Sequence, residues 1–212
     1  EIKFNAIPDK SIPKKNKPQF NYTIYADVTD ITGETHSSQT SVSVGYIGLN
    51  ANVDLPERLL QEEAKELDII TKNLNGEFEA AKGKIKIEQL QVPTVVYNNR
   101  KWGRPDYFVL SEADFKKDFP QYAYKKEDQK QSWKVVKTVL DDSFDSEKSK
   151  KLELKGVKSW KAGAYKLTLT TKDRFGNDIE VVKFFQLYSS EADEVSMNKA
   201  LFLANSSLTG EP

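Results

Sequence analysis

The sequence of 212 residues has no cysteine and only one histidine, His36. Without cysteine the chain has no disulfide bond, thiolate nucleophile, iron–sulfur cluster or cysteine-ligated zinc. A zinc site of the usual kind needs several nitrogen or sulfur ligands, which one histidine does not supply. A Ser–His–Asp triad would have to use His36. That residue follows a turn signal in an alternating polar run, which favours a solvent-exposed strand histidine. We therefore assign no catalytic, cofactor-binding or metal-binding residue and do not expect an enzyme.

The chain also lacks an excess of charge and a long apolar run. Its 32 basic and 32 acidic residues give a formal net charge of zero, so nucleic acid is not an expected partner. No window approaches the roughly 20 apolar residues of a membrane helix. No signal peptide is recognisable at Glu1, and we expect any targeting segment to have been removed or to lie outside this piece. With 38% hydrophobic and 11% aromatic residues, the chain can form the core of one or two domains.

Two segments of the sequence share one pattern. Residues 20–44 (FNYTIYADVTDITGETHSSQTSVSV) align without a gap on residues 164–187 (AYKLTLTTKDRFGNDIEVVKFFQL), so that Tyr22 matches Tyr165. Each segment begins with apolar residues that alternate with polar ones, the period of a strand with one buried face. An Asp-x-x-Gly follows, in which aspartate can cap a turn and glycine can adopt a positive φ. Each segment is therefore predicted to be a β-hairpin, with Gly33 and Gly176 at positive φ.

Carboxylates gather near both predicted turns: Asp27, Asp30 and Glu34 in the first hairpin, Asp173 and Asp178 in the second. Such clusters can suggest calcium. The spacing of an EF-hand loop is absent, and neither turn has a dense run of oxygen ligands. Capping of the turns is the better interpretation, and no metal is assigned.

The repeat predicts an all-β fold of tandem immunoglobulin/fibronectin-III-like β-sandwiches. A long stretch precedes the second hairpin and only a short one precedes the first. We therefore expect residues 1–48 to be the C-terminal part of one sandwich and 49–190 a complete antiparallel second one. Residues 191–212 are expected to be a linker or the start of a further domain. The two hairpins should lie in different sheets.

The middle of the chain has a different pattern. Residues 66–73 and 83–92 are predicted strands, joined through the turn signal at 73–76. The stretch 56–64 has helical propensity but is expected to be extended or irregular. Residues of about 93–150 do not alternate and are predicted to form a long insertion, with strands resuming near 151–157. Ser111 can cap a short helix that ends at Pro120.

The insertion is rich in lysine and aromatic residues, with Tyr122, Tyr124 and Trp133 inside the run from Lys116 to Lys137. That composition could bind nucleic acid through stacking and phosphate contacts. Interleaved acidic residues favour an ordinary solvated surface instead. A sugar-binding platform remains a second alternative. Tryptophans 102 and 133 are expected to anchor the insertion to the sandwich.

Several segments together resemble a family. They are PQFNYTIYADVTDITGETHSSQTSVSVG, ELDIITKNLNGE, KIKIEQLQVPT, RKWGRPDYFVLSEADFKKDFPQY and GAYKLTLTTKDRFGN. In this combination they resemble the macroglobulin-type domains of bacterial α2-macroglobulin family proteins, particularly the long ones of the Bacteroides group. The resemblance covers most of residues 1–190. It implies consecutive seven-stranded sandwiches in a large exported protein that is periplasmic, extracellular or outer-membrane-associated, with membrane anchoring as one of the forms that the family takes.

Members of that family trap proteases. The resemblance implies a bait segment that is cut, a change of shape and, in many members, capture through a Cys–Gln thioester. This chain has no cysteine and so no thioester, and no functional residue of the family maps onto it. The implied role is a structural scaffold whose partners are neighbouring domains and, through the whole protein, target proteases. The alternative is an immunoglobulin-like module of a bacterial surface protein that binds glycans or mediates adhesion.

Overall fold

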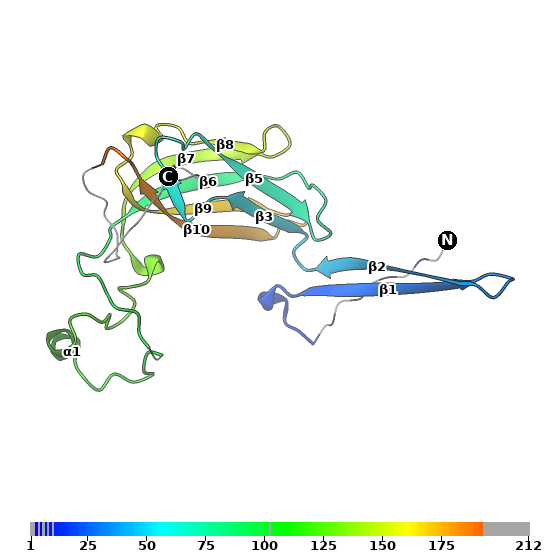
Figure 1. The fold of residues 1–212 in the computed structure, drawn as a ribbon, viewed down its shortest axis with the longest axis horizontal. Helices are drawn as coiled ribbons and strands as arrows, with labels where there is room; N and C mark the ends of the chain where they lie inside the picture. The colour runs from blue at the N-terminus through cyan, green and yellow to red at the C-terminus, as the bar shows by residue number, and fades with distance from the viewer. Residues whose placement is uncertain are drawn as a thin grey trace, which may run out of the picture.

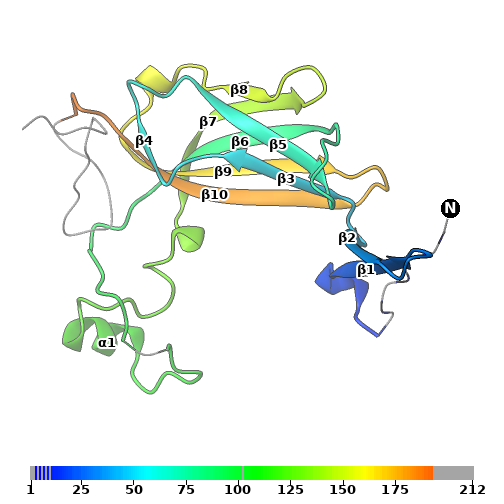
Figure 2. The same cartoon turned by 45° about the vertical axis from the view of Figure 1, so that its right-hand side comes forward.

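The computed structural model describes residues 11–101 and 103–192, together with Lys3, Asn5, Ile7 and Asp9. Within this part, ten β-strands and a single α-helix are joined by turns and 3-10 segments. The all-β class expected from the sequence is thus confirmed. Two packed sheets form the body of the molecule, a long hairpin projects from one side, and an irregular insertion projects from another (Figures 1 and 2).

The projecting hairpin consists of β1 (Gln19–Thr29) and β2 (Thr35–Gly45), which pair with each other and with no other strand of the described residues. A 3-10 turn (Lys14–Asn16) precedes it. The register places Tyr22 opposite Val42 and Phe20 opposite Val44. Because directly opposed residues share a face of a sheet, the apolar residues of both strands gather on one face of this hairpin.

The larger sheet of the body has the order β4-β10-β9-β6-β7. Its strands are β4 (Arg58–Leu60), β6 (Lys82–Leu90), β7 (Val135–Asp145), β9 (Gly163–Lys172) and β10 (Asp178–Tyr188). The expectation of a purely antiparallel sandwich is wrong at one pair, because β4 runs parallel to β10. The long connection between these two strands leaves room for a parallel crossing, whereas a hairpin would not. As expected, the stretch that contains β4 is extended rather than helical.

The smaller sheet has the order β3-β5-β8 and consists of β3 (Leu49–Asp54), β5 (Glu66–Asn73) and β8 (Lys151–Glu153). It lies over the larger sheet, with β3 against β9 and β10. Alternate residues of both sheets fill the space between them, which is the usual core of a β-sandwich. The core is centred on fully buried Val53, Ile85, Ile87, Tyr165, Leu167, Leu169, Phe185 and Leu187.

The two repeated segments form the expected hairpins in different sheets: the first is β1–β2 and the second is β9–β10. Gly33 has φ +88° and Gly176 has φ +84°, which confirms the predicted positive φ at both loops. This backbone region is strained for residues with a Cβ, which explains glycine at the same place in both copies. The predicted strand at 66–73 is also confirmed, and the strand predicted at 83–92 spans Lys82–Leu90.

The insertion is shorter than expected. β7 lies inside the range of about 93–150, so the irregular part covers residues 91–134 and is called the insertion from here on. Regular structure near 151–157 consists only of β8 and a 3-10 turn (Val157–Ser159). The sequence hid β7 because Asp142 occupies a position opposite buried Ile85, where alternation requires an apolar residue. Lys155 pairs with that carboxylate at 2.7 Å.

The predicted helix is confirmed as α1 (Glu112–Asp118). The Ser111 hydroxyl accepts a hydrogen bond from the Asp114 backbone N–H and donates one to the Asp114 carboxylate, so Ser111 is the N-cap. The chain leaves the helix at Phe119, directly before Pro120. No helix among the described residues is long and apolar enough to span a membrane. The predicted linker or domain start at 191–212 lies outside the described residues except for Glu191 and Ala192, and Trp102 lies outside them as well.

Candidate functional site

His36 lies on β2 with its side chain exposed, as the alternating polar run predicted. Its nearest ionic neighbour is Glu34, whose carboxylate is 3.8 Å from the imidazole Nε2. The residue directly opposite His36 is Val28, which has no hydroxyl, and the next residue, Thr29, hydrogen-bonds with Thr35 at 2.8 Å. The structure thus does not bring His36 into a nucleophile–base arrangement with the described residues.

The aspartates of the two hairpin loops cap turns. Asp30 Oδ1 accepts hydrogen bonds from the backbone N–H groups of Thr32 at 2.8 Å and Glu34 at 3.0 Å. Asp173 Oδ1 accepts the equivalent pair, from Phe175 and Asn177, at 2.9 Å each. These bonds from the backbone to Oδ1 are those of aspartates that cap turns, as the capping interpretation expected. Among the described residues, no group of three or more potential ligands is placed to hold a metal.

Asp173 has a second role that Asp30 lacks. Its Oδ2 accepts a hydrogen bond from the backbone N–H of Gly48 at 3.0 Å, in the segment that joins the projecting hairpin to the sandwich. Burial raises the pKa of Asp173, but hydrogen bonds from the Asn177 side chain and from backbone N–H groups outweigh it and leave the pKa below its ordinary value. Asn177 also donates to the carbonyl of Tyr46 at 3.0 Å. The second hairpin loop therefore holds the base of the first hairpin.

The insertion has a small aromatic core of its own. The Tyr124 ring lies 4.5 Å from that of Phe108 and 5.3 Å from that of Phe115, which in turn contacts Phe119. The guanidinium of Arg100 lies over the Phe115 ring at 5.6 Å and donates to the carbonyl of Ala123 at 2.6 Å. Such ring pairs contribute about 0.5–1.5 kcal/mol each beyond the area that they bury. The insertion is thus a structured lobe, with a cluster that the irregular sequence pattern did not predict.

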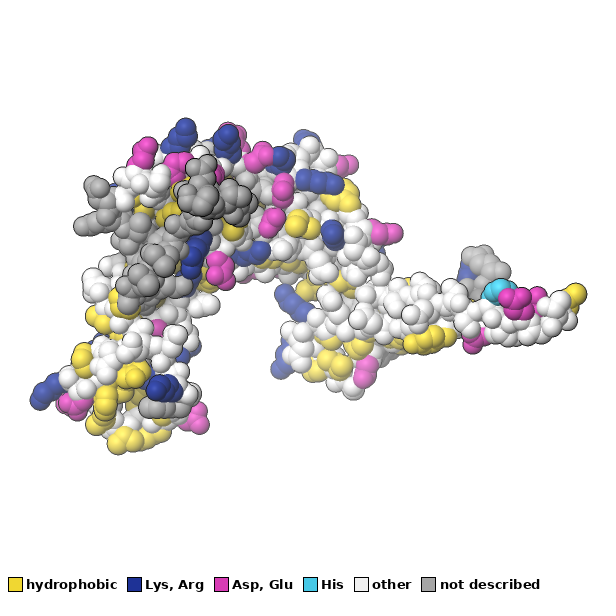
Figure 3. All heavy atoms as spheres, viewed as in Figure 1, with side chains coloured by type: hydrophobic (Ala, Val, Ile, Leu, Met, Phe, Trp, Pro, Cys, Tyr) yellow, Lys and Arg dark blue, Asp and Glu magenta, His cyan; other side chains and the backbone are white. Residues whose placement is uncertain are grey.

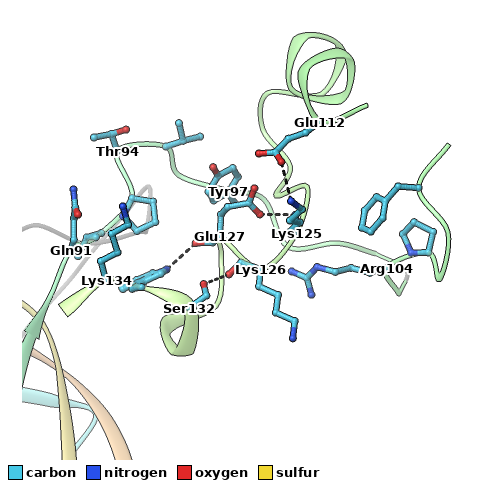
Figure 4. Close-up of a pocket in the computed structure, with 16 residues that line it drawn as sticks. Gln91, Thr94, Tyr97, Arg104, Glu112, Lys125, Lys126, Glu127, Ser132 and Lys134 are labelled. Atoms are coloured by element: carbon cyan, nitrogen blue, oxygen red, sulfur yellow. Dashed lines mark hydrogen bonds and ion pairs between the residues drawn. The ribbon is translucent and has the colours of Figure 1, made fainter. Parts of the chain in front are cut away.

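A groove of about 970 Å³ lies where the insertion leaves and rejoins the sandwich, and we call it the neck groove (Figure 4). Its walls come from the outgoing chain after β6, the segment before α1, and the returning chain before β7. The lining residues are Gln91, Val92, Pro93, Thr94, Val95, Tyr97, Arg104, Pro105, Phe108, Glu112, Lys125, Lys126, Glu127, Ser132, Trp133 and Lys134.

Hydrogen bonds between these segments hold the walls in place. The Trp133 indole N–H donates to the carbonyl of Glu127 at 2.8 Å, and the backbone N–H of Gln91 donates to the carbonyl of Lys134, also at 2.8 Å. Arg104, which lines the groove, pairs with Asp128 on the returning chain. Trp133 was expected to anchor the insertion to the sandwich. Its indole N–H bonds instead to Glu127 within the insertion, next to the start of β7.

Charges are unevenly paired around the neck groove. Glu112 pairs with Lys116 at 2.6 Å and with Lys125 at 3.2 Å, and these hydrogen bonds hold the pKa of Glu112 below its ordinary value. Lys126 and Lys134 are exposed and form no ion pair with a described residue. The lysine-rich run was expected to be an ordinary solvated surface. In the structure Lys116 and Lys125 pair with Glu112, whereas Lys126 and Lys134 at the groove have no ionic partner among the described residues. Sequence reasoning identified the run but not the groove, whose walls are far apart along the chain.

A scan of the sequence against protein-family models finds no matching family, and a search for similar curated proteins finds no match. Two features of the molecule bear on its function: the repeated hairpin and the neck groove.

Proposed function

We propose that this chain is a non-catalytic structural module of a larger protein built from repeated β-sandwiches. The observation that carries this proposal is that one hairpin occurs twice, once covered and once uncovered. In β9–β10 the inward residues Tyr165, Leu167 and Leu169 are fully buried beneath the three-stranded sheet. Their counterparts on β1, which are Tyr22, Ile24 and Ala26, are half-buried or exposed.

The same contrast holds on the returning strands. Phe185 and Leu187 of β10 are fully buried, whereas their counterparts Val42 and Val44 are exposed and half-buried. Further along β1, Val28 is 65% exposed. A two-stranded hairpin alone is marginally stable in water, and burying each large apolar side chain contributes about 1.5–3 kcal/mol. The uncovered face is therefore suited to pack against another sheet, in the way that β3-β5-β8 packs on β9–β10.

The specific role that we propose is a scaffold in an exported α2-macroglobulin-like protease inhibitor of bacterial origin. Its support is the sequence resemblance together with the repeated sandwich hairpin. In such a protein the sandwiches position a bait segment and the trapping elements, which lie in other parts of the chain. The loop contacts of Asp173 and Asn177 with the hairpin base fit this role, because they fix one sandwich relative to the next.

The trapping role is tested with proteases of different specificity, such as trypsin, subtilisin and elastase. The 212-residue chain alone should neither hydrolyse protein substrates nor lower protease activity when mixed in equimolar amounts at nanomolar concentration. The longer natural protein that contains it should lower protease activity stoichiometrically while being cut. If all three proteases stay fully active and the longer protein is not cut, the inhibitor role is rejected. Inhibition by the isolated chain without its own cleavage would refute the scaffold role.

The sandwich-module proposal has a separate test in the longer protein. Replacing Tyr22 and Ile24 with glutamate places charge on the apolar face of the hairpin and should lower the melting temperature substantially, because buried charges are costly. The matched control replaces Thr23 and Tyr25, on the opposite face of the same strand, where Tyr25 is 72% exposed. The control should change the melting temperature little. Equal effects of the two double variants would contradict the proposed sheet contact.

A second candidate function is a binding module of a bacterial surface protein, with glycans or another surface as ligand. The exposed aromatic residues of the insertion, such as Tyr107, favour it. Binding of the chain to a glycan array, abolished by removal of the insertion, would support this candidate over the scaffold.

A further inference from the structure

We propose that the neck groove binds a short acidic peptide segment of a partner protein. Volumes of roughly 300–1,000 Å³ are typical of specific ligand sites, and the neck groove is at the upper end of that range. An open groove of this size, lined by three separate segments of the chain, has room for a short extended peptide. This inference is independent of the scaffold role, since it concerns the insertion and not the hairpin.

The apolar part of the groove offers contact area to a peptide. Val92 and Pro93, which follow β6 in the chain, line the groove together with Pro105 and Phe108, which come before α1. Trp133 lies at the junction of the groove with β7. Because the hydrogen bonds of Trp133, Gln91 and Arg104 already hold these walls, a ligand meets a site formed in advance and loses less entropy on binding.

The charges of the groove determine the sign of the charge that a ligand should have. Arg104 and Lys125 have acidic partners within the protein, Asp128 and Glu112. Lys126 and Lys134 do not have one among the described residues, so their ammonium groups are available to ligand carboxylates. The Arg104 Nε is also buried without a hydrogen-bond partner in the described part of the chain. Positive charge with few internal partners favours an anionic ligand, and it raises the association rate as well.

The backbone around the groove favours a peptide over a sugar or a nucleic acid. The backbone N–H groups of Thr94, Val95 and Val96 donate to no other described backbone group, and these three residues are exposed. They can donate to the carbonyls of an added chain. A sugar or base platform instead needs an open ring face. The Phe108 ring is engaged with Tyr124 at 4.5 Å, and the Trp133 N–H is used within the protein.

The surface beside the groove extends the same docking face. Tyr107 is 80% exposed and Val109 is 87% exposed, both in the segment that leads to α1. Figure 3 shows apolar side chains gathered over this lobe. Isolated exposed apolar residues are ordinary, but several together on a structured lobe are typical of a surface that contacts a partner.

The test measures binding of fluorescein-labelled octapeptides to the intact chain by fluorescence anisotropy. The first peptide alternates glutamate with leucine, valine and proline. In two matched peptides the glutamates are replaced by glutamine or by lysine. The acidic peptide should bind saturably and more weakly as the salt concentration rises, because exposed charges are screened. The glutamine and lysine peptides should bind at least about tenfold more weakly.

Variants that reverse the charge of two groove lysines test whether the peptide binds in the neck groove. The double variant Lys126→Glu/Lys134→Glu should weaken binding of the acidic peptide at least about tenfold. The control Lys84→Glu/Lys148→Glu changes two exposed lysines at the far end of the β6–β7 pair and should leave binding unchanged. All four positions are exposed, so both variants should fold, which thermal unfolding checks. Amide shifts in NMR spectra should move at residues 91–97 and 125–134.

Three results would overturn the proposal. The first is the absence of saturable binding of the acidic peptide at millimolar concentration. The second is equal binding by the site and control variants. The third is stronger, variant-sensitive binding of heparin or of single-stranded oligonucleotide than of the acidic peptide, which would assign the groove to another class of polyanion.

Discussion

Tyr22 and Tyr165 occupy the same place in the repeat but have different surroundings. The ring of Tyr165 is fully buried between Trp160, at 5.7 Å, and Phe185, at 5.4 Å. Its hydroxyl donates to the carbonyl of Lys161 at 2.7 Å, and burial raises its pKa to about 12. Tyr22 is half-buried on a hairpin face that no described sheet covers, and its hydroxyl donates to the carbonyl of Ile7. Comparing substitutions at these two equivalent positions therefore shows how much stability a covering sheet contributes.

Alanine at each position should give very different results. Tyr165→Ala removes a buried ring and should destabilise the chain by about 3–5 kcal/mol. Tyr22→Ala should cost less than about 1 kcal/mol, because Tyr22 lies on the projecting hairpin and is not part of the sandwich core. Chemical denaturation monitored by the circular dichroism of the sandwich measures both. Similar losses for the two variants would mean that the uncovered face is packed in solution.

Asp173 makes stability depend on pH. Its pKa in the folded chain is below the ordinary value of 3.8, so the unfolded chain binds its proton at higher pH than the folded chain. The stability that this carboxylate contributes is fully present above the unfolded-state pKa and is lost as the pH falls through the folded-state pKa.

Asp173→Asn should therefore lower the free energy of unfolding at pH 7 and make that free energy fall less steeply as the pH is lowered. Urea unfolding at pH 7 and at successively lower pH measures this; Asp178→Asn, at an exposed site, is the control. An equally steep decline in Asp173→Asn would exclude this role.

Strands and hairpins could be predicted from sequence wherever one face alternates without interruption. The strand pattern of 66–73 and the Asp-x-x-Gly turns gave correct elements, because short-range chemistry alone decides them. β7 could not be recognised, since Asp142 sits at an inward position of an edge strand and β-bulges shift the register near Glu88 and Leu90. The parallel pairing of β4 with β10 depends on contacts between distant segments, which no local pattern encodes.

The neck groove could not be predicted either, because it too depends on contacts between segments that are distant in the sequence. Tyr97, Arg104 and Trp133 lie on three separate segments that only the folded insertion brings together. What the sequence did carry was the composition: lysines and aromatic residues in one run. Whether that run became a solvated surface or a lined groove depended on which lysines found acidic partners, such as Lys125 with Glu112.

The insertion should be removable as an element. Leu90 and Val135 are paired neighbours on β6 and β7, so a short turn can join these strands directly. Replacing residues 92–133 with a Gly/Ser turn should preserve the fold, because the aromatic core of the insertion is separate from the sandwich core. Thermal unfolding should show one cooperative transition near that of the parent, with peptide binding lost. A shortened chain that fails to fold would show that the insertion is part of the sandwich.

At the scale of the whole molecule, two copies of one hairpin give the chain its organisation. The second copy lies within a sandwich, and the first projects from it, held at its base by the loops that contain Asn75 and Asp173. The length of the chain and the repeat spacing predicted this separation. The orientation of the hairpin could not be predicted, because it is set by a few hydrogen bonds at the junction.

Hydrogen–deuterium exchange of the intact 212-residue chain, resolved into peptides, tests the central claim most directly. If β1–β2 is a sandwich hairpin without its covering sheet, peptides from 19–45 should exchange at rates near those of unstructured chain. Peptides from 163–188 should exchange orders of magnitude more slowly, because their opening requires unfolding of the core. Equal and strong protection of both hairpins would contradict the claim, since the first hairpin would then be stably packed within this chain.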